Sequence, residues 1–232
     1  MSTFSVIATP IGNLEDITLR ALKVLSSCDL ILCEDTRMTK RLLDRHNISK
    51  ATKSYHMHSK ISRVDEIIDL LKEGKNLALV SDAGTPGISD PGAELVSRIR
   101  KECSNEIMNG SIKIEAIPGP SAVTSALSIA GVPCADFTFL GFLPHKKGRE
   151  TLFSEIAKSE RTMVFYESPH RIMKTLESLV EHLTMMQKVT VCRELTKIFE
   201  EIVVGSPKEV KNYFEIHPDK VRGEFVVIVS KD

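Results

Sequence analysis

The stretch Ser81-Asp-Ala-Gly-Thr-Pro-Gly-Ile-Ser-Asp-Pro-Gly92 determines how this chain folds, because it joins a strand to a helix through a long, rigid loop. It follows the apolar run Asn76-Leu-Ala-Leu-Val80, typical of a buried strand, and precedes residues 93–100, whose apolar spacing indicates a helix. Such a connection usually needs only a few residues. Glycine permits close backbone approach and proline fixes φ, so we interpret the loop as a ligand-binding surface at a strand's carboxyl end. An elaborate turn without a ligand is the alternative.

Strand-like and helix-like segments alternate through the first half of the chain. Apolar runs typical of strands lie near residues 4–8, 29–33, 76–80 and 111–117. Between them, apolar residues recur at helical spacing, and Thr18 and Ser59 are each placed to cap a helix. This order predicts a mostly parallel sheet covered by helices.

The Pro/Gly cluster Ile117-Pro-Gly-Pro-Ser-Ala122 marks the expected boundary between a domain of residues 1–118 and one of residues 119–232. Beyond it we expect helices at 121–130, at 150–158 and from Pro169 to about Leu183, and strands near 137–140, 161–166, 188–193, 198–204 and 223–230. Three consecutive strands with little helix between them favour antiparallel pairing. The fold class is therefore α/β, with a parallel-sheet N-terminal domain and a mixed-sheet α+β C-terminal domain.

Composition limits the compartment and the class of protein. None of the 232 residues belongs to an apolar run of the length, roughly 20 residues, that a membrane span requires, and the N-terminus lacks the features of a signal peptide. The five cysteines form no C-x-x-C pair, which favours a reducing, cytoplasmic compartment and argues against a zinc cluster. His56 and His58 lack a third ligand nearby, so we expect no metal site.

Charge is balanced overall, with 31 basic and 31 acidic residues, but it is unevenly distributed. Eight basic residues against the single acid Asp44 lie in one segment: Arg37, Lys40, Arg41, Arg45, Lys50, Lys53, Lys60 and Arg63. The local excess predicts a surface for a polyanion. The alternative is a solvated helix face whose charges are balanced by acids elsewhere.

The long loop carries carboxylates instead of a phosphate-binding signature. Neither G-x-G-x-x-G nor a P-loop is present, which weakens dinucleotide and nucleoside triphosphate interpretations. Asp82 and Asp90 would repel a phosphate, so they favour a ligand with hydroxyl groups or a positive centre.

Seven further motifs accompany the loop: Ala8-Thr-Pro-Ile-Gly-Asn-Leu14, Cys33-Glu-Asp-Thr-Arg37, Ile117-Pro-Gly-Pro-Ser-Ala122, Gly141-Phe-Leu-Pro144, Phe165-Tyr-Glu-Ser-Pro-His-Arg171, Arg193-Glu-Leu-Thr-Lys197 and Gly223-Glu-Phe-Val226. Together they make the chain resemble the bacterial 16S ribosomal RNA 2′-O-ribose methyltransferase I family, of the class III, tetrapyrrole methylase-like enzymes that use S-adenosylmethionine. The match covers essentially the whole chain. Many members extend further at the C-terminus than this sequence does.

The resemblance implies methyl transfer to the 2′-hydroxyl of a cytidine in the decoding region of 16S rRNA, within the 30S subunit, by a homodimer. It also implies that S-adenosylmethionine lies in the cleft between two domains. Carried over motif by motif, the cofactor-binding residues are Pro10, Asp82, Ala83, Gly84, Ser89, Ser121, Ala122 and Glu167. A tetrapyrrole or protein methylase on the same fold, or a non-catalytic ribosome-binding module, are the alternatives.

Methyl transfer requires alignment of the ribose oxygen with the methyl donor and loss of the hydroxyl proton. Candidate catalytic residues, as bases or orienting groups, are Glu34, Asp35, Arg37, Glu194 and Lys197. Lys197 could act as a base only if its pKa were lowered. The alternative is an ion pair, Arg193–Glu34 or Arg37–Glu194, that braces the site. Candidate RNA-binding residues are Arg37, Lys40, Arg41, Lys146, Lys147, Arg149 and Arg171.

Overall fold

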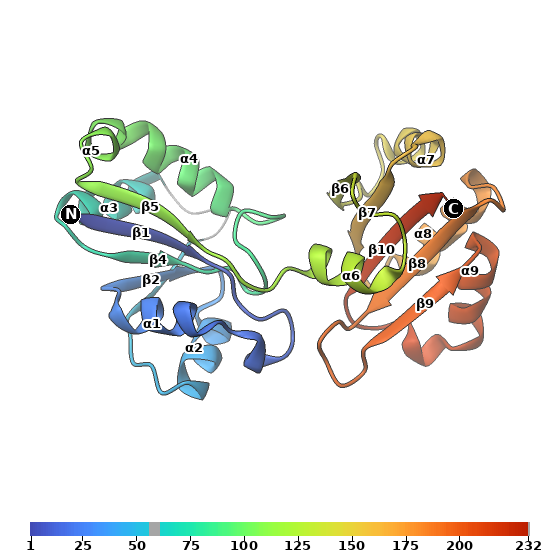
Figure 1. Ribbon diagram of the computed structural model, residues 1–232, viewed down its shortest axis with the longest axis horizontal. Helices are drawn as coiled ribbons and strands as arrows, with labels where there is room; N and C mark the ends of the chain where they lie inside the picture. Colours follow the sequence, from blue (N-terminus) through green and yellow to red (C-terminus); the bar gives the residue numbers. More distant parts are fainter. Residues whose placement is uncertain (56–60, 232) are drawn as a thin grey trace. The chain divides into compact units, whose positions relative to one another are not determined.

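The computed structural model describes residues 1–55 and 61–231, which form two compact units, Met1–Ser121 and Ala122–Asp232 (Figure 1). The first unit ends after Ser121, later than the expected boundary at residue 118. The reason is local, since Thr85 Oγ1 donates a hydrogen bond of 3.1 Å to the Pro120 carbonyl and so holds that segment to the first unit. Within the described residues, no helix has the length and apolar character needed to cross a membrane.

The first unit contains the expected parallel sheet. Its strands are β1 (Ser2–Ile7), β2 (Leu30–Cys33), β3 (Thr52–Ser54), β4 (Leu77–Leu79) and β5 (Ile112–Ile117). They lie in the order β3-β2-β4-β1-β5, and every neighbouring pair is parallel. The edge strand β3 was not expected, because its Thr-Lys-Ser sequence is short and polar and becomes a strand only by pairing with β2.

Helices cover both faces of this sheet. They are α1 (Leu19–Ser27), α2 (Thr36–Arg45), α3 (Ile61–Lys72), α4 (Gly92–Glu102) and α5 (Ser104–Met108), with a short 3-10 helix η1 (Leu14–Asp16) before α1. Leu25 of α1 and Leu42 of α2 belong to one hydrophobic cluster, while Ile67 of α3 and Leu95 of α4 belong to another. Figure 1 shows α1 and α2 on the side of the sheet opposite α4 and α5.

The helix caps follow the sequence. Thr18 accepts a hydrogen bond from the Ala21 amide and caps α1, as expected. Asp35 caps α2 by accepting from the Arg37 amide. The expected cap at Ser59 lies outside the described residues.

The neighbouring strands β4 and β1 lead to helices on opposite faces of the sheet. β1 is followed by α1 and β4 by α4, so their loops diverge at the carboxyl ends of neighbouring strands. In open α/β sheets this switch point is where ligands bind. The long loop at 81–92 begins there.

The second unit contains a mixed sheet, as expected. Its strands are β6 (Phe137–Phe142), β7 (Thr162–Glu167), β8 (Gln187–Arg193), β9 (Glu201–Gly205) and β10 (Phe225–Lys231). In the order β6-β7-β10-β8-β9, only β6 and β7 pair in parallel. The helices are α6 (Ala122–Ala130), α7 (Arg149–Lys158), α8 (Ile172–His182) and α9 (Pro207–Ile216), with a 3-10 helix η2 (Pro218–Lys220).

One helix of this unit contradicts the expectation of little helix between the last strands. α9 separates β9 from β10 and packs Val210 and Phe214 into the core. Its start had a recognisable signal, because Ser206 and Glu209 form a capping box around Pro207 at the first helical position. The helix expected from Pro169 begins only at Ile172.

Candidate active site

Two loops of the first unit are joined directly beyond the switch point. The Thr9 amide donates to the Gly84 carbonyl over 2.9 Å, and the Gly84 amide donates to the Thr9 carbonyl over 3.0 Å. Thr9 Oγ1 also donates to the Ser81 carbonyl, at 3.2 Å. The loop after β1 therefore fixes the start of the long loop after β4.

Gly84 is the residue around which the loops converge. Its φ of +77° lies in the left-handed region that favours glycine. A Cβ there would lie 3.4 Å from Ile11 Cγ2 and 3.7 Å from the Pro120 carbonyl oxygen, both ordinary contacts. Backbone conformation, more than lack of space, therefore accounts for glycine at this position.

The remainder of the long loop is organised by its own side chains. The Asp90 carboxylate accepts hydrogen bonds from the Gly87 amide (2.8 Å) and the Gly92 amide (2.7 Å). The carboxylate of Asp90, expected together with Asp82 to favour a hydroxyl-bearing or cationic ligand, therefore binds the backbone of its own loop. Ser89, which is exposed, has a φ of +69°, a strained conformation for a residue other than glycine.

Asp82 connects the long loop to the loop after β2. Its Oδ1 accepts a hydrogen bond of 3.0 Å from the Asp35 amide, and the residue is exposed. Burial, together with the negative charges of Asp82 and Asp90, raises the pKa of the neighbouring Glu34 carboxyl. The carboxyl ends of the strands thus form an acidic region that favours a cation over a phosphate.

Asp35 and Arg37, both candidate catalytic residues, are paired with each other. Arg37 Nη2 lies 2.6 Å from Asp35 Oδ2, and the Arg37 side chain is 88% exposed. Hydrogen bonds from the Arg37 side chain and backbone lower the pKa of Asp35 to about 2. Asp35 is therefore ionised at neutral pH and is a poor proton acceptor.

Glu194 and Lys197 lie in the second unit, in the connection from β8 to β9. Lys197 Nζ is 2.8 Å from both Glu194 Oε1 and Glu224 Oε2. Burial alone would lower the pKa of Lys197, but hydrogen bonds to these two carboxylates raise it. This direction contradicts a neutral lysine base. Burial opposes ionisation of Glu194, yet the Lys197 hydrogen bond brings its pKa below the ordinary value.

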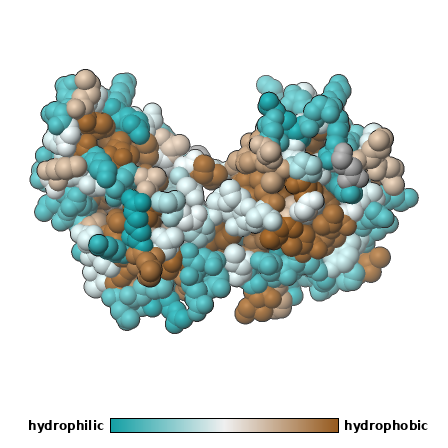
Figure 2. Space-filling model, viewed as in Figure 1, coloured by the Kyte–Doolittle hydropathy of each residue, from teal (hydrophilic) through white to brown (hydrophobic). Residues whose placement is uncertain are grey.

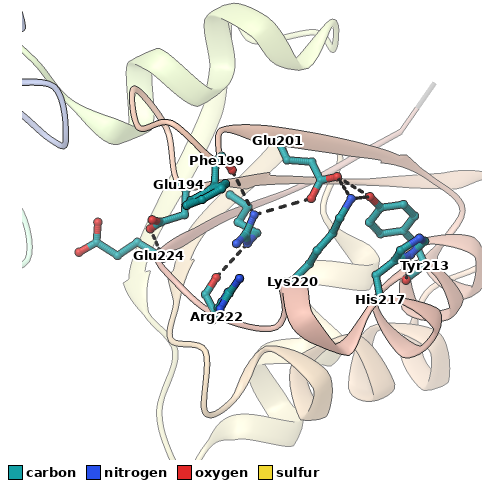
Figure 3. A network of polar contacts seen from close by, with 9 residues as sticks. Glu194, Phe199, Glu201, Tyr213, His217, Lys220, Arg222 and Glu224 are labelled. Carbon is teal, nitrogen blue, oxygen red and sulfur yellow. Dashed lines mark hydrogen bonds and ion pairs between the residues drawn. The ribbon is translucent and has the colours of Figure 1, made fainter.

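The buried Arg193, the last residue of β8, binds backbone on both sides of β9: Phe199 before it and Arg222 after it, both labelled in Figure 3. Its Nε donates to the Arg222 carbonyl at 2.9 Å and its Nη1 to the Phe199 carbonyl at 3.1 Å, with Glu201 Oε2 3.9 Å away. Glu201 in turn binds Lys220 and a tyrosine hydroxyl. The bracing pairs considered from the sequence are Arg193–Glu34 and Arg37–Glu194. Each of these side chains has a neighbour within its own unit: Glu201 for Arg193, Asp82 for Glu34, Asp35 for Arg37 and Lys197 for Glu194.

Glu167, expected to bind the cofactor, is buried in the second unit, with 2% of its surface exposed. It lies 2.7 Å from Arg171 Nη2 and accepts a 2.6 Å hydrogen bond from Thr175 Oγ1. Arg149 is also buried, at 5% exposure, and donates to the same Thr175 hydroxyl. These contacts give Glu167 and Arg149 partners within the second unit, and burial removes Arg149 from the exposed basic surface.

The other candidate cofactor residues are divided between the two units at the ends of these loops. Pro10 is buried beside Thr9, Ala83 is exposed, and Ser121 and Ala122 are half-buried. Among the described residues, no three His, Cys, Asp or Glu side chains are arranged to hold a metal ion. His56 and His58 lie outside the described residues.

Comparison with known proteins agrees with this geometry. Residues 3–211 match the model of the family described as Tetrapyrrole (Corrin/Porphyrin) Methylases. A protein of Thermotoga maritima named ribosomal RNA small subunit methyltransferase I is 44% identical, over 99% of this chain and 99% of its own length. A relative of the same name in Vibrio cholerae is also 44% identical, over 97% of this chain and 75% of its own length.

This chain belongs to the ribosomal RNA small subunit methyltransferase I family. Solved structures support the fold. The methyltransferase CobJ superposes with a TM-score of 0.67 at 18% identity, covering 100% of this chain and 95% of CobJ. A uroporphyrin-III-C-methyltransferase from Thermus thermophilus superposes with a TM-score of 0.66 at 17% identity, covering 99% of this chain and 94% of that one.

In this member of the methyltransferase I family, acids pair with part of the basic run, as Asp35 does with Arg37. Lys53 and Arg63 both pair with Glu66, so the alternative of balanced charges applies to them. Lys40 and Arg41 lie exposed on α2. Lys60 lies outside the described residues.

The second basic segment of this methyltransferase family member contributes the exposed Lys146 and Lys147, between β6 and α7. Arg171 is only 16% exposed in its side chain and donates to the Leu143 carbonyl at 2.8 Å. Arg171 therefore anchors the backbone of this segment and is not part of its exposed basic surface.

Proposed function

We propose that this protein transfers a methyl group from S-adenosylmethionine to the ribose 2′-hydroxyl of a cytidine in the decoding region of 16S rRNA, within the 30S subunit. The observation that carries the proposal is the pair of hydrogen bonds between Thr9 and Gly84 at the switch point of the sheet. The chain that forms this sheet belongs to the ribosomal RNA small subunit methyltransferase I family. A non-catalytic ribosome-binding module has no need of such an ordered loop.

The residues around Gly84 suit S-adenosylmethionine in shape and charge. Ala83, next to Gly84 in the chain, is exposed, which lets a ligand approach the main chain there. The carboxylates of Asp82 and Glu34 can accept hydrogen bonds from ribose hydroxyls and favour a positive centre. When bound, the cofactor supplies an electrophilic methyl group on a sulfonium. We assign its binding to Pro10, Asp82, Ala83, Gly84, Ser89, Ser121 and Ala122.

Of the candidate catalytic residues, Glu34 is the best suited to accept the proton of the 2′-hydroxyl. Its raised pKa makes its carboxylate a stronger base than that of Asp35, whose pKa is about 2. Lys197, held protonated by its carboxylate neighbours, would act as a cation that orients or stabilises negative charge. We assign Arg37 to RNA binding, because its side chain is exposed.

RNA would be held through phosphates by the exposed cations Arg37, Lys40 and Arg41 of the first unit and by Lys146 and Lys147 of the second. A substrate in the 30S subunit implies a cytoplasmic enzyme.

We also propose a homodimer. The edge strand β9 exposes Ile202 (39%) and Val204 (53%), and Figure 2 shows hydrophobic surface over β8 and β9. A second copy would cover this apolar edge.

The test is transfer of labelled methyl groups from S-adenosylmethionine to 30S subunits, to protein-free 16S rRNA and to tetrapyrrole precursors. We expect labelled 2′-O-methylcytidine in the rRNA of 30S subunits. Label in the tetrapyrrole or in ribosomal protein would support the other methylase functions. Absence of cofactor binding in calorimetry would leave the ribosome-binding module.

A further inference from the structure

An exposed aromatic side chain stands at the end of the edge strand β6. Phe142 is 57% exposed, although it pairs in register with Tyr166 of β7. The two rings are 5.4 Å apart between centroids, tilted by 58°. Tyr166 in turn makes an edge-to-face contact of 4.9 Å with Phe139. Phe142 is therefore the outermost ring of an aromatic row and is supported from behind.

The segment that follows Phe142 is held by two arginine side chains. Arg171 Nη1 donates to the Leu143 carbonyl at 2.8 Å, and Arg149 Nη1 donates to the Pro144 carbonyl at 3.3 Å. Both guanidinium groups belong to the buried network around Glu167. The backbone next to Phe142 is thereby anchored to the core, which limits the entropy lost when a ligand binds there.

Three exposed residues that can carry positive charge come next in the chain: His145, Lys146 and Lys147. An aromatic face beside cations is the arrangement that binds single-stranded nucleic acid, since bases stack on the ring and phosphates lie against the charges. Charge therefore distinguishes this surface from the apolar edge at β9, where Ile202 and Val204 are the exposed apolar side chains.

We propose that Phe142 is a stacking platform for an unpaired base of the RNA substrate, with the neighbouring phosphates held by Lys146 and Lys147. This inference rests on the proposed function, because it takes RNA as the substrate. It adds a contact that distinguishes an unpaired, unstacked base from a base in a helix. Contacts with phosphates do not make this distinction.

Salt dependence separates the two kinds of contact. Stacking releases no counterions, so Phe142→Ala should weaken binding to a protein-free 16S rRNA transcript about 5- to 100-fold at every salt concentration, with an unchanged slope. Lys146→Glu with Lys147→Glu should instead reduce the slope of affinity against salt. Phe142→Trp, which keeps a stacking face, should preserve affinity.

Phe137 provides the matched control, because it lies at the other end of β6 and is 38% exposed. Phe137→Ala should leave RNA affinity unchanged. Sedimentation of wild type and Phe142→Ala should give the same mass, whereas a lower mass for the variant would mean that a second copy of the chain covers Phe142 and would overturn the proposal.

Fluorescence offers a direct readout, because the chain contains no tryptophan. In Phe142→Trp the single indole should be quenched on addition of the transcript, while in Phe137→Trp it should not. Unquenched indole fluorescence in Phe142→Trp, together with an unchanged KM of Phe142→Ala for 30S subunits, would overturn the stacking role. That outcome differs from failure of the proposed function, in which the wild-type protein itself transfers no methyl group to 30S subunits.

Discussion

The backbones of Thr9 and Gly84 form two reciprocal hydrogen bonds, of 2.9 Å and 3.0 Å, although the residues are far apart in the chain. They join the loops of neighbouring strands that lead to opposite faces of the sheet. The long loop is therefore held near its start by the loop after β1, and any strain at Gly84 should be transmitted to the proposed cofactor site.

Gly84→Ala should lower both stability and cofactor affinity. A non-glycine residue at a φ of +77° costs about 1–2 kcal/mol, and the loop would relax away from Thr9. We expect S-adenosylmethionine to bind roughly tenfold more weakly, which corresponds to about 1.4 kcal/mol in calorimetry.

Gly74→Ala is the control, because Gly74 has a φ of +90° and, apart from its chain neighbours, no atom of the described residues lies within 4 Å of the added Cβ. It should lower the free energy of unfolding by a similar amount and leave cofactor affinity intact. Equal losses of affinity in both variants would show that the effect at Gly84 is a general loss of stability.

Glu34→Gln should change how stability depends on pH. Because burial and nearby acids raise the pKa of Glu34 above 4.5, the folded state holds this proton more tightly than the unfolded chain. The free energy of unfolding therefore falls as pH rises from the ordinary pKa of a glutamate to the raised pKa of Glu34. It stays lower at every pH above that range.

The glutamine variant should lack this decline and also transfer methyl groups more slowly, as loss of a base predicts. Denaturant unfolding on both sides of the pH window measures the first effect, and single-turnover methylation measures the second. Matching unfolding profiles for wild type and variant would argue against the raised pKa.

Glu167→Gln should destabilise the protein strongly. Glu167 is 2% exposed, and its carboxylate forms an ion pair with Arg171. Removal of the negative charge leaves the largely buried guanidinium of Arg171 without its ion-pair partner, so the free energy of unfolding should fall by about 3 kcal/mol. Glu160→Gln removes an ion pair with Lys231 in which the glutamate is 83% exposed, and should change stability by less than about 1 kcal/mol. Similar losses in the two variants, measured by denaturant unfolding, would contradict a structural role for Glu167.

Reversal of the charges of Lys40 and Arg41 should weaken RNA binding and flatten its salt dependence. Each lost phosphate contact lowers the slope of log affinity against log salt by about 1. The double reversal of Arg100 and Lys101 makes the same change in net charge on α4, which packs against the other face of the sheet from α2. If both pairs changed the slope equally, a general charge effect would explain the binding better than a surface on α2.

Much of the fold could be predicted from local signals. The parallel sheet of the first unit followed from apolar runs alternating with helical spacing, and the cap at Thr18 from its hydroxyl before an apolar helix. The prediction failed where a segment has no such signal, as in β3, or where one was overlooked, as in the capping box of α9. Strand β3 exists because β2 supplies its hydrogen-bond partners.

The sequence by itself determined the fold class, the family and the position of the long loop. Apolar periodicity, the placement of proline and glycine, and the order of the motifs depend only on the order of residues along the chain. Only the tertiary structure decided what each charged residue does. Asp82 remains exposed while Asp90 binds its own loop, and Lys146 is exposed while Arg149 is buried. Burial and hydrogen-bond partners often come from segments distant in sequence, as Thr175 does for Arg149, so spacing along the chain could not reveal them.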